Sequence, residues 1–209
     1  MSISKLSLVA LLAITANTAT ADGFYAGGGL GYYSSTSEGP FDGMTSDPAE
    51  SEATYFSIGA TAGYRMDLQS TFVAGEVDVD FILDSDFEFE DLACSDGAIA
   101  PYYCEHTYTA RFRGMVGTEV APGFEAFAMG GIAVMTGEGA VDTNEVDTGT
   151  NSGFTIGAGA QADVGTGKVR FEVNYDQLEN SVSSPSDGTI DYEPTLESVS
   201  AKVTYLLSF

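Results

Sequence analysis

The chain has 209 residues, enough for one domain, and its formal charge of −24 comes from 31 acidic and seven basic residues. Such acidity argues against nucleic-acid binding and against adsorption to anionic headgroups, because both need surface cations. After the N-terminal region no segment is apolar for long enough to cross a bilayer as a helix, so a membrane-spanning form would have to be a β-barrel.

The first 21 residues have the features of a secretory signal peptide. A lysine precedes an apolar run over residues 6–16, and Ala19-Thr20-Ala21 supplies a cleavage site before Asp22. The apolar run is too short for a transmembrane helix. We therefore expect residues 1–21 to be removed on export and residues 22–209 to form a single barrel domain.

Eight segments in which apolar and polar residues alternate follow this leader. A period of two predicts strands with one apolar and one polar face. In the last segment every second residue from Val199 to Phe209 is apolar, whereas the first is rich in glycine and the fifth is apolar on both faces. The eight segments cover residues 24–33, 54–66, 71–83, 105–120, 124–136, 152–164, 168–178 and 196–209.

The connections between these segments alternate strictly in length. Short ones follow the second, fourth and sixth segments, at residues 67–70, 121–123 and 165–167. Long ones follow the other four, at about residues 34–53, 84–104, 137–151 and 179–195. Short periplasmic turns and long external loops are typical of transmembrane barrels. The sequence therefore predicts an all-β fold, an eight-stranded antiparallel up-and-down transmembrane β-barrel with both mature termini on the periplasmic side.

The charged residues of these segments lie on the polar faces. Each of the six basic residues after residue 21 belongs to a segment and has the polar parity. A charge facing lipid costs about 2–4 kcal/mol at mid-bilayer, whereas a polar lumen can pair it. We therefore expect a lumen network of six cations and six carboxylates, namely Arg65, Arg111, Arg113, Lys168, Arg170, Lys202, Glu76, Asp78, Asp80, Glu125, Glu172 and Asp176.

This lumen network has two interpretations. Eight strands leave room only for side chains, so fully paired charges would fill and occlude the lumen. An unpaired stripe of charge would instead line a narrow, ion-selective, porin-like channel. We favour the occluded lumen, in which small residues on the first two segments make room for long arginines (Gly27, Gly29, Ser57, Gly59 and Thr61). A soluble ligand-binding barrel ranks third, because the other face of the strands is apolar.

The two ends of the mature chain resemble a known family. Phe24-Tyr25-Ala26-Gly27-Gly28-Gly29-Leu30-Gly31-Tyr32 resembles the first strand of small outer-membrane barrels, the OmpA-like and opacity-type surface antigens. Residues 203–209 look like the family's assembly signal, with apolar positions at Val203, Tyr205, Leu207 and Phe209. The resemblance implies a Gram-negative outer membrane, contact with its lipid and lipopolysaccharide, and delivery by periplasmic chaperones to the barrel-assembly machinery. It does not imply a peptidoglycan-binding domain.

The long connections hold the remaining candidate sites. Cys94 and Cys104 predict one disulfide in an exported chain, which would stabilise the second long loop by about 2–3 kcal/mol. Carboxylates crowd the second and third long connections and either bind Ca²⁺ or Mg²⁺ or form a solvated acidic surface. We favour the solvated surface, because the calcium-loop pattern that begins at Asp142 lacks its required glycine. These carboxylates are Asp84, Asp86, Glu88, Glu90, Asp91, Glu138, Asp142, Glu145 and Asp147.

The sequence contains no constellation typical of catalysis. The single histidine, His106, shares the parity of Tyr108 and is predicted to face lipid, and no His-x-Ser pair is present. Residues 157–162 match a dinucleotide fingerprint only nominally, since no helix follows them. We expect no catalytic residue, cofactor or metal, and a non-enzymatic barrel that contacts external host or cell-surface ligands through its acidic loops or supports the membrane.

Overall fold

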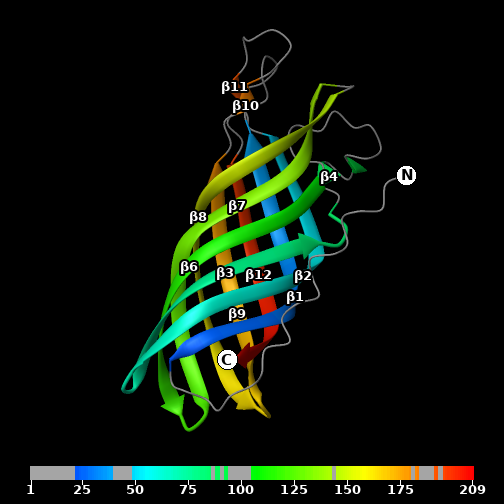
Figure 1. Ribbon diagram of the computed structural model, residues 1–209. Helices are drawn as coiled ribbons and strands as arrows, with labels where there is room; N and C mark the ends of the chain where they lie inside the picture. The colour runs from blue at the N-terminus through cyan, green and yellow to red at the C-terminus, as the bar shows by residue number, and fades with distance from the viewer. Residues whose placement is uncertain are drawn as a thin grey trace, which may run out of the picture.

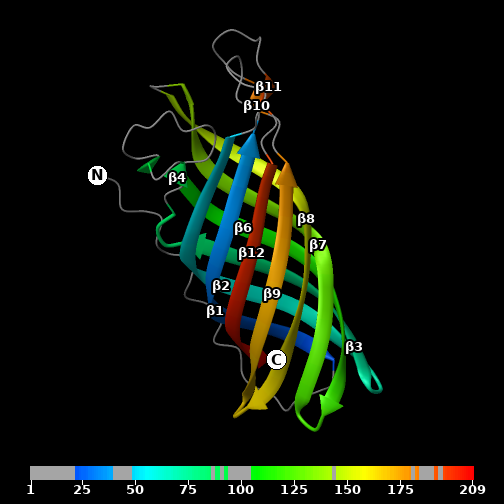
Figure 2. The same cartoon turned by 180° about the vertical axis from the view of Figure 1, so that it is seen from behind.

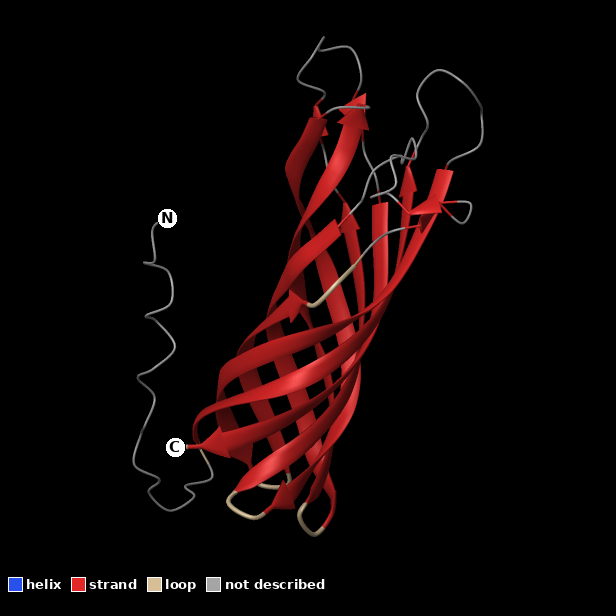
Figure 3. Cartoon of the chain, turned by 90° about the vertical axis from the view of Figure 1, so that its right-hand side faces the viewer, coloured by secondary structure: helices blue, strands red, loops and turns tan. Residues whose placement is uncertain are grey.

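The computed structural model describes residues 22–39, 49–85, 88–89, 92–93, 105–142, 145–179, 182–183, 191–192 and 195–209, and strands make up nearly all of this part of the chain (Figure 3). The eight long strands are β1 Gly23–Gly39, β2 Ala49–Leu68, β3 Thr71–Ile82, β6 Glu105–Ala121, β7 Phe124–Asp142, β8 Glu145–Val164, β9 Gly167–Glu179 and β12 Thr195–Ser208. Four strands have two residues each, β4 Glu88–Phe89, β5 Leu92–Ala93, β10 Val182–Ser183 and β11 Asp191–Tyr192. Among the described residues, no helix is long and apolar enough to span a membrane.

The eight long strands form one closed antiparallel barrel (Figure 1). Each pairs with its neighbours in the chain, and β1 pairs with β12 to close the ring, as Figure 2 shows from behind. Following the paired residues round the ring from Gly28 leads back to β1 at Glu38, ten residues further along. Such a stagger tilts the strands, and eight tilted strands enclose a space just wide enough for side chains.

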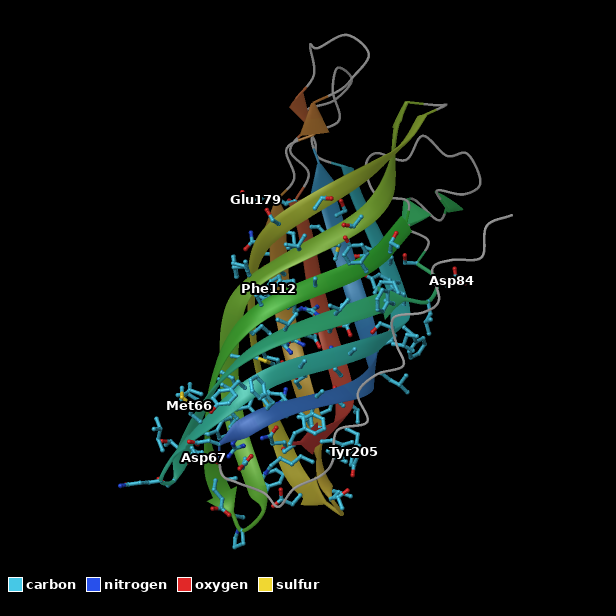
Figure 4. All side chains as sticks on the ribbon, in the orientation of Figure 1. Met66, Asp67, Asp84, Phe112, Glu179 and Tyr205 are labelled. Carbon is cyan, nitrogen blue, oxygen red and sulfur yellow. The ribbon has the colours of Figure 1, made fainter. Side chains whose placement is uncertain are left out.

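The two ends of the barrel differ in their connections. The turns β2–β3, β6–β7 and β8–β9 share one end, where Gln69, Gly123 and Gly165 adopt positive φ angles of 62°, 70° and 62°. At this end the Phe209 N–H donates to the Phe24 carbonyl oxygen at 2.8 Å. We call it the short-turn end and the opposite one the long-loop end. In Figure 4, Asp67 marks the first and Glu179 the second.

The predicted all-β fold with eight antiparallel strands in a closed barrel is confirmed. Strands β1, β2, β7 and β8 extend further toward the long-loop end than predicted. The expected long connection over residues 137–151 is wrong, because β7 and β8 stay paired up to Asp142 and Glu145. The strand ends that lie outside the apolar part of a membrane need no apolar face. The alternation from which the strands were predicted therefore stops several residues before the strands end.

Side chains alternate between the lumen and the outer wall along the long strands, except at the register shift in β6 near His106. The outer wall carries most of the exposed large apolar side chains, among them Leu30 and Phe112, which are 66% and 51% exposed. Aromatic pairs lie near both of its margins, with Phe24 on Tyr64 toward the short-turn end and Tyr32 on Phe56 toward the long-loop end. An apolar wall between aromatic girdles is the form that a barrel takes in a bilayer.

Candidate functional site in the barrel lumen

Three layers of side chains fill the lumen along its axis. The first is an apolar cluster toward the long-loop end, here called the outer seal, formed by Tyr33, Ala53, Tyr55, Ala133, Met135, Leu178 and Leu196. The last is a smaller apolar cluster toward the short-turn end, the inner seal, formed by Phe72, Met115, Phe127 and Met129. Between them lies the ion-pair layer, whose charged members are Glu76, Asp78, Asp80, Arg111, Arg113, Arg170, Glu172, Asp176 and Lys202.

Arg111 on β6 is the centre of the ion-pair layer. Its Nη1 lies 2.8 Å from Asp80 Oδ2 and 3.2 Å from Asp78 Oδ1, on the neighbouring strand β3. Its Nε and Nη2 donate to the carboxylate of Asp176, with distances of 3.0 Å and 2.5 Å. Asp176 is on β9, three strands further round the ring, so this guanidinium links separate parts of the wall. Its side chain has no exposed surface.

Two more cations cross-link the same carboxylates. Lys202 Nζ on β12 lies 2.6 Å from Asp78 Oδ2 and 2.8 Å from Asp80 Oδ1. Arg113 pairs with Glu76, and its Nη1 lies 2.9 Å from Glu172 Oε1. Glu76 also accepts from Arg170 at 2.5 Å and from the hydroxyl of Tyr25 at 2.7 Å. The layer is therefore a continuous network rather than a set of separate pairs.

A second charged group, the short-turn cluster, lies below the inner seal and is partly exposed. Arg65 donates to both oxygens of Glu125 at 2.8 Å, and its guanidinium carbon lies 3.9 Å from the centre of the Phe72 ring. Lys168 Nζ lies 3.3 Å from Glu125 and 2.7 Å from Asp163. The side chains of Arg65 and Lys168 are 18% and 23% exposed.

The structure places all twelve predicted network residues in the lumen or at its short-turn mouth. Each cation has a carboxylate, and each carboxylate a cation, within 4.0 Å. Six cations face six carboxylates, so the twelve carry no net charge. A buried charge without a partner is strongly unfavourable, whereas a balanced and hydrogen-bonded set is tolerated.

Small and neutral polar residues complete the packing of the ion-pair layer. A Cβ at Gly59 would overlap Asp80 Oδ1, so this glycine makes room for the carboxylate. Thr61 donates to Asp78 at 2.7 Å, and Tyr33 donates to Asp80. The two tyrosines, Tyr25 and Tyr33, were missed as network members because the prediction considered charges alone. Their parity, shared with Gly27 and Gly29, would have identified them.

The prediction that His106 faces lipid is wrong. Its side chain is buried, and its Nδ1 and Nε2 lie 2.5 Å from Tyr55 Oη and 2.8 Å from Thr109 Oγ1. The β6–β7 register shifts between His106 and Tyr108, and this irregularity turns His106 inward, to the same side as Thr109 and Arg111. A β-bulge re-aims the side chains next to it, and simple alternation cannot show this.

The remaining predicted residues fall into three groups. The apolar positions of the assembly signal, of which Val203, Tyr205 and Leu207 are exposed, lie at the short-turn end of β12 and its C-terminus. Cys94 and Cys104 lie outside the described residues, as do Asp86, Glu90 and Asp91. Asp84 is exposed, and the other carboxylates of the long connections lie on strand ends whose side chains are not described. Within the described ranges, no group of three or more His, Cys, Asp or Glu side chains is placed to hold a metal ion.

Comparison with known proteins identifies the family of this barrel. The chain is similar in structure to Ail of Yersinia pestis, with 10% identity, a TM-score of 0.42, and 89% of this chain and 99% of Ail covered. It is also similar to the outer membrane protease OmpT of Escherichia coli (8% identity, TM-score 0.48, 93% and 99% covered) and to the outer membrane protein AlkL (13%, 0.48, 94% and 96%). No curated protein matches it in sequence. The family model for the outer membrane protein β-barrel domain matches residues 6–205, so the chain belongs to this family and is an outer-membrane protein.

Proposed function

We propose that this protein is a non-enzymatic outer-membrane barrel with an occluded lumen, which acts through its acidic external surface in contact or adhesion, or which supports the membrane. The observation that carries this proposal is the complete pairing of the twelve lumen charges, nine of which lie in the ion-pair layer between two apolar seals. A conducting lumen needs a continuous polar path that water can follow. Here each charge is used by another side chain.

The small size of one cavity in the described part of the lumen supports the same conclusion. A cavity at the short-turn end, lined by Arg65, Lys168 and Arg170 among others, has a volume of about 20 Å³. This is room for roughly one water molecule, since a water needs at least about 10–15 Å³. Above it, the side chains of Arg111, Asp78 and Asp176 have no exposed surface. A hydrated ion would have to break several ion pairs to pass.

The surroundings of His106 support the absence of an enzyme activity. Histidine is the usual general base of hydrolytic sites, and it must reach the substrate to act. His106 is 1% exposed and both of its ring nitrogens are within hydrogen-bond distance of hydroxyls. Thr109, its hydroxyl neighbour, has no exposed surface, so it is inaccessible as a nucleophile.

The sign of the surface charge defines the chemistry of a partner. From residue 22 onward the sequence has six basic residues, and all six belong to the lumen or to the short-turn cluster. Six of the 31 acidic residues balance these six cations, and the sequence from residue 22 onward has no other lysine or arginine to balance the remaining 25. Such a surface attracts cationic partners. It binds anionic partners, including lipopolysaccharide phosphates, through divalent cations that bridge the two sets of negative charges.

The orientation follows from the two kinds of connection. We place the short-turn end in the periplasm and the long-loop end outside, because periplasmic turns are the short ones in this class of barrel. Residues 1–21 would be removed as a signal peptide. The last strand, with Val203 to Phe209, would be recognised by the assembly machinery, and a disulfide between Cys94 and Cys104 would close the second external loop.

Conductance of the refolded protein in planar bilayers tests the proposal. Heat-modifiable gel mobility first confirms that the barrel has formed. Wild-type barrels should be silent, and Arg111→Ala should produce openings, because Asp176 then loses its partner and its carboxylate must be hydrated. Phe112→Leu, one position away on the outer wall, is the matched control and should remain silent.

A narrow ion-selective channel is the second candidate function. It is favoured by the partial exposure of Arg65 and Lys168, whose ion pairs at the short-turn mouth are within reach of water. Steady, ion-selective openings of the wild-type protein would support it and would contradict the occluded lumen.

A further inference from the structure

The regular strand pairing of the barrel wall has a discontinuity near the long-loop end, between β2 and β6. Strand β3 separates these two strands over most of the wall but ends at Ile82. β2 extends beyond that level to Ala49, and β6 extends to Glu105. Beyond the end of β3 the pairing is irregular: the Leu83 N–H donates to the Phe56 carbonyl oxygen at 2.9 Å, and the two-residue strand β4 pairs with β2 at Glu88 and Glu52. Among the described residues, no strand pairs with both β2 and β6 at this level.

A chain of side-chain hydrogen bonds crosses this discontinuity. His106 Nδ1 on β6 lies 2.5 Å from Tyr55 Oη on β2, and its Nε2 lies 2.8 Å from Thr109 Oγ1. Tyr55 Oη lies 2.6 Å from Ser35 Oγ on β1, which lies 2.9 Å from Ser198 Oγ on β12. We call the contact between His106 and Tyr55 the histidine bridge. It ties β6 to three other strands at the level of the outer seal.

The backbone holds His106 in this position. Ser85 Oγ donates to the His106 carbonyl oxygen at 2.9 Å and accepts from its N–H at 2.7 Å, at the irregularity in β6. The ring is packed edge-on against Tyr55 and Tyr33, with centroid distances of 5.1 Å and 6.2 Å. The imidazole therefore has no room to turn outward without breaking these contacts.

Among the side chains that the structure describes, no free carboxylate faces the imidazole. The described ionisable side chains around it are Tyr33 on β1, Tyr55 on β2, Arg111 on its own strand and Asp176 on β9. Asp176 already accepts from Arg111, and Asp80 on β3 is held by Arg111 and Lys202. A neutral imidazole fits the site, because one nitrogen donates and the other accepts. An imidazolium would be a second cation beside Arg111 in a dry layer.

We propose that His106 is a proton-operated latch, whose protonation breaks the histidine bridge, separates the outer ends of β2 and β6 and opens the outer seal above a closed ion-pair layer. The direction of the pH dependence follows from the linkage between protonation of His106 and opening. The open form gains a proton that the closed form excludes, so the closed form is favoured at neutral pH and loses stability on acidification. The ion-pair layer has its own pairs and does not depend on the bridge.

Amide hydrogen exchange of the refolded protein in lipid measures this opening directly. We compare the outer ends of β2 and β6, residues 51–57 and 105–109, with residues 76–80 of β3 at about pH 7.5 and about pH 4.5, on either side of the ordinary imidazole range. After correction for the intrinsic rates, exchange at the outer ends should rise by about tenfold or more in acid, while that of residues 76–80 stays unchanged. Equal protection of the outer ends at both pH values would overturn the proposal.

Variants separate the latch from a general effect of acid. His106→Gln has no group to protonate, and its exchange at the outer ends should not respond to pH. Tyr55→Phe keeps the ring and removes the bridging oxygen, so its outer ends should exchange fast at both pH values. Tyr64→Phe, on the outer wall of β2, should behave like the wild type.

An acid response of the same size in His106→Gln would contradict the latch. If that variant does not refold, Tyr55→Phe decides, because a tenfold acid response in the absence of the bridge would equally contradict it. The measurement is independent of conduction: a barrel that is silent at every pH can still show the exchange change, and a conducting barrel can lack it.

Discussion

The two charged groups of the lumen use the same side-chain types in very different surroundings. Arg111 and Asp176 in the ion-pair layer have no exposed surface, whereas Lys168 and Asp163 in the short-turn cluster are 23% and 60% exposed. Water can solvate the second pair when it separates, but it cannot reach the first. Breaking a buried pair typically costs about 3–5 kcal/mol, and an exposed pair contributes about 0–1 kcal/mol. The difference predicts that breaking a pair destabilises the barrel far more in the ion-pair layer than in the short-turn cluster.

Arg111→Ala is the strongest test of this difference. It leaves Asp176 and Asp80 buried with fewer partners and should lower the free energy of unfolding by about 3–5 kcal/mol. Urea unfolding in lipid vesicles, followed by gel mobility or tyrosine fluorescence because the chain has no tryptophan, measures the change. Phe112→Leu is the control. If the free energy of unfolding falls by less than about 1 kcal/mol, the buried ion pairs contribute no more than exposed ones do.

Tyr25→Phe examines a neutral member of the same layer. The hydroxyl donates to Glu76 at 2.7 Å, so its removal leaves a buried carboxylate short of one hydrogen bond. Hydrogen bonds to charged groups contribute about 1.5–3 kcal/mol, and the same unfolding assay should show a loss of that size. Tyr64→Phe on the outer wall should change little. Equal effects of the two substitutions would mean that Tyr25 acts through packing alone.

Gly59→Ala asks whether the room for Asp80 is required. The added Cβ would overlap Asp80 Oδ1, which Lys202 holds in place, and overpacking of this kind costs about 1–3 kcal/mol. Gly75 is the matched site on the outer wall, because a Cβ there meets nothing within 4 Å. Gly75→Ala should leave the midpoint of unfolding almost unchanged. A neutral result at Gly59 would show that the network can shift to accept a methyl group.

Lys168→Ala should have the smallest effect. Its amine lies 2.7 Å from the exposed Asp163, and Glu125 keeps its two bonds to Arg65. The loss should be about 0–1 kcal/mol and should shrink further as salt screens the pair. Unfolding at low and high ionic strength checks this. A loss as large as that of Arg111→Ala, insensitive to salt, would remove the distinction between the two groups.

The sequence predicted much of this molecule because a membrane barrel imposes a simple code. Alternation along Val169, Arg170, Phe171 and Glu172 gave both the strand and the side on which each residue lies. All twelve network residues followed from that parity. The extension of β7 and β8 to Asp142 and Glu145 did not follow, because strand ends above the bilayer are no longer alternately apolar.

What the sequence by itself determined was the fold class, the family and the list of charged residues that face inward, since lipid on one side and a narrow lumen on the other make each position either apolar or paired. Only the tertiary structure decided which charges meet. Arg111 reaches Asp176 on a strand that is not its neighbour, and strand alternation contains no information on contacts across the lumen. The tertiary structure also decided the position of His106, because the β-bulge after this residue depends on the register between β6 and β7 and not on the sequence of either strand alone.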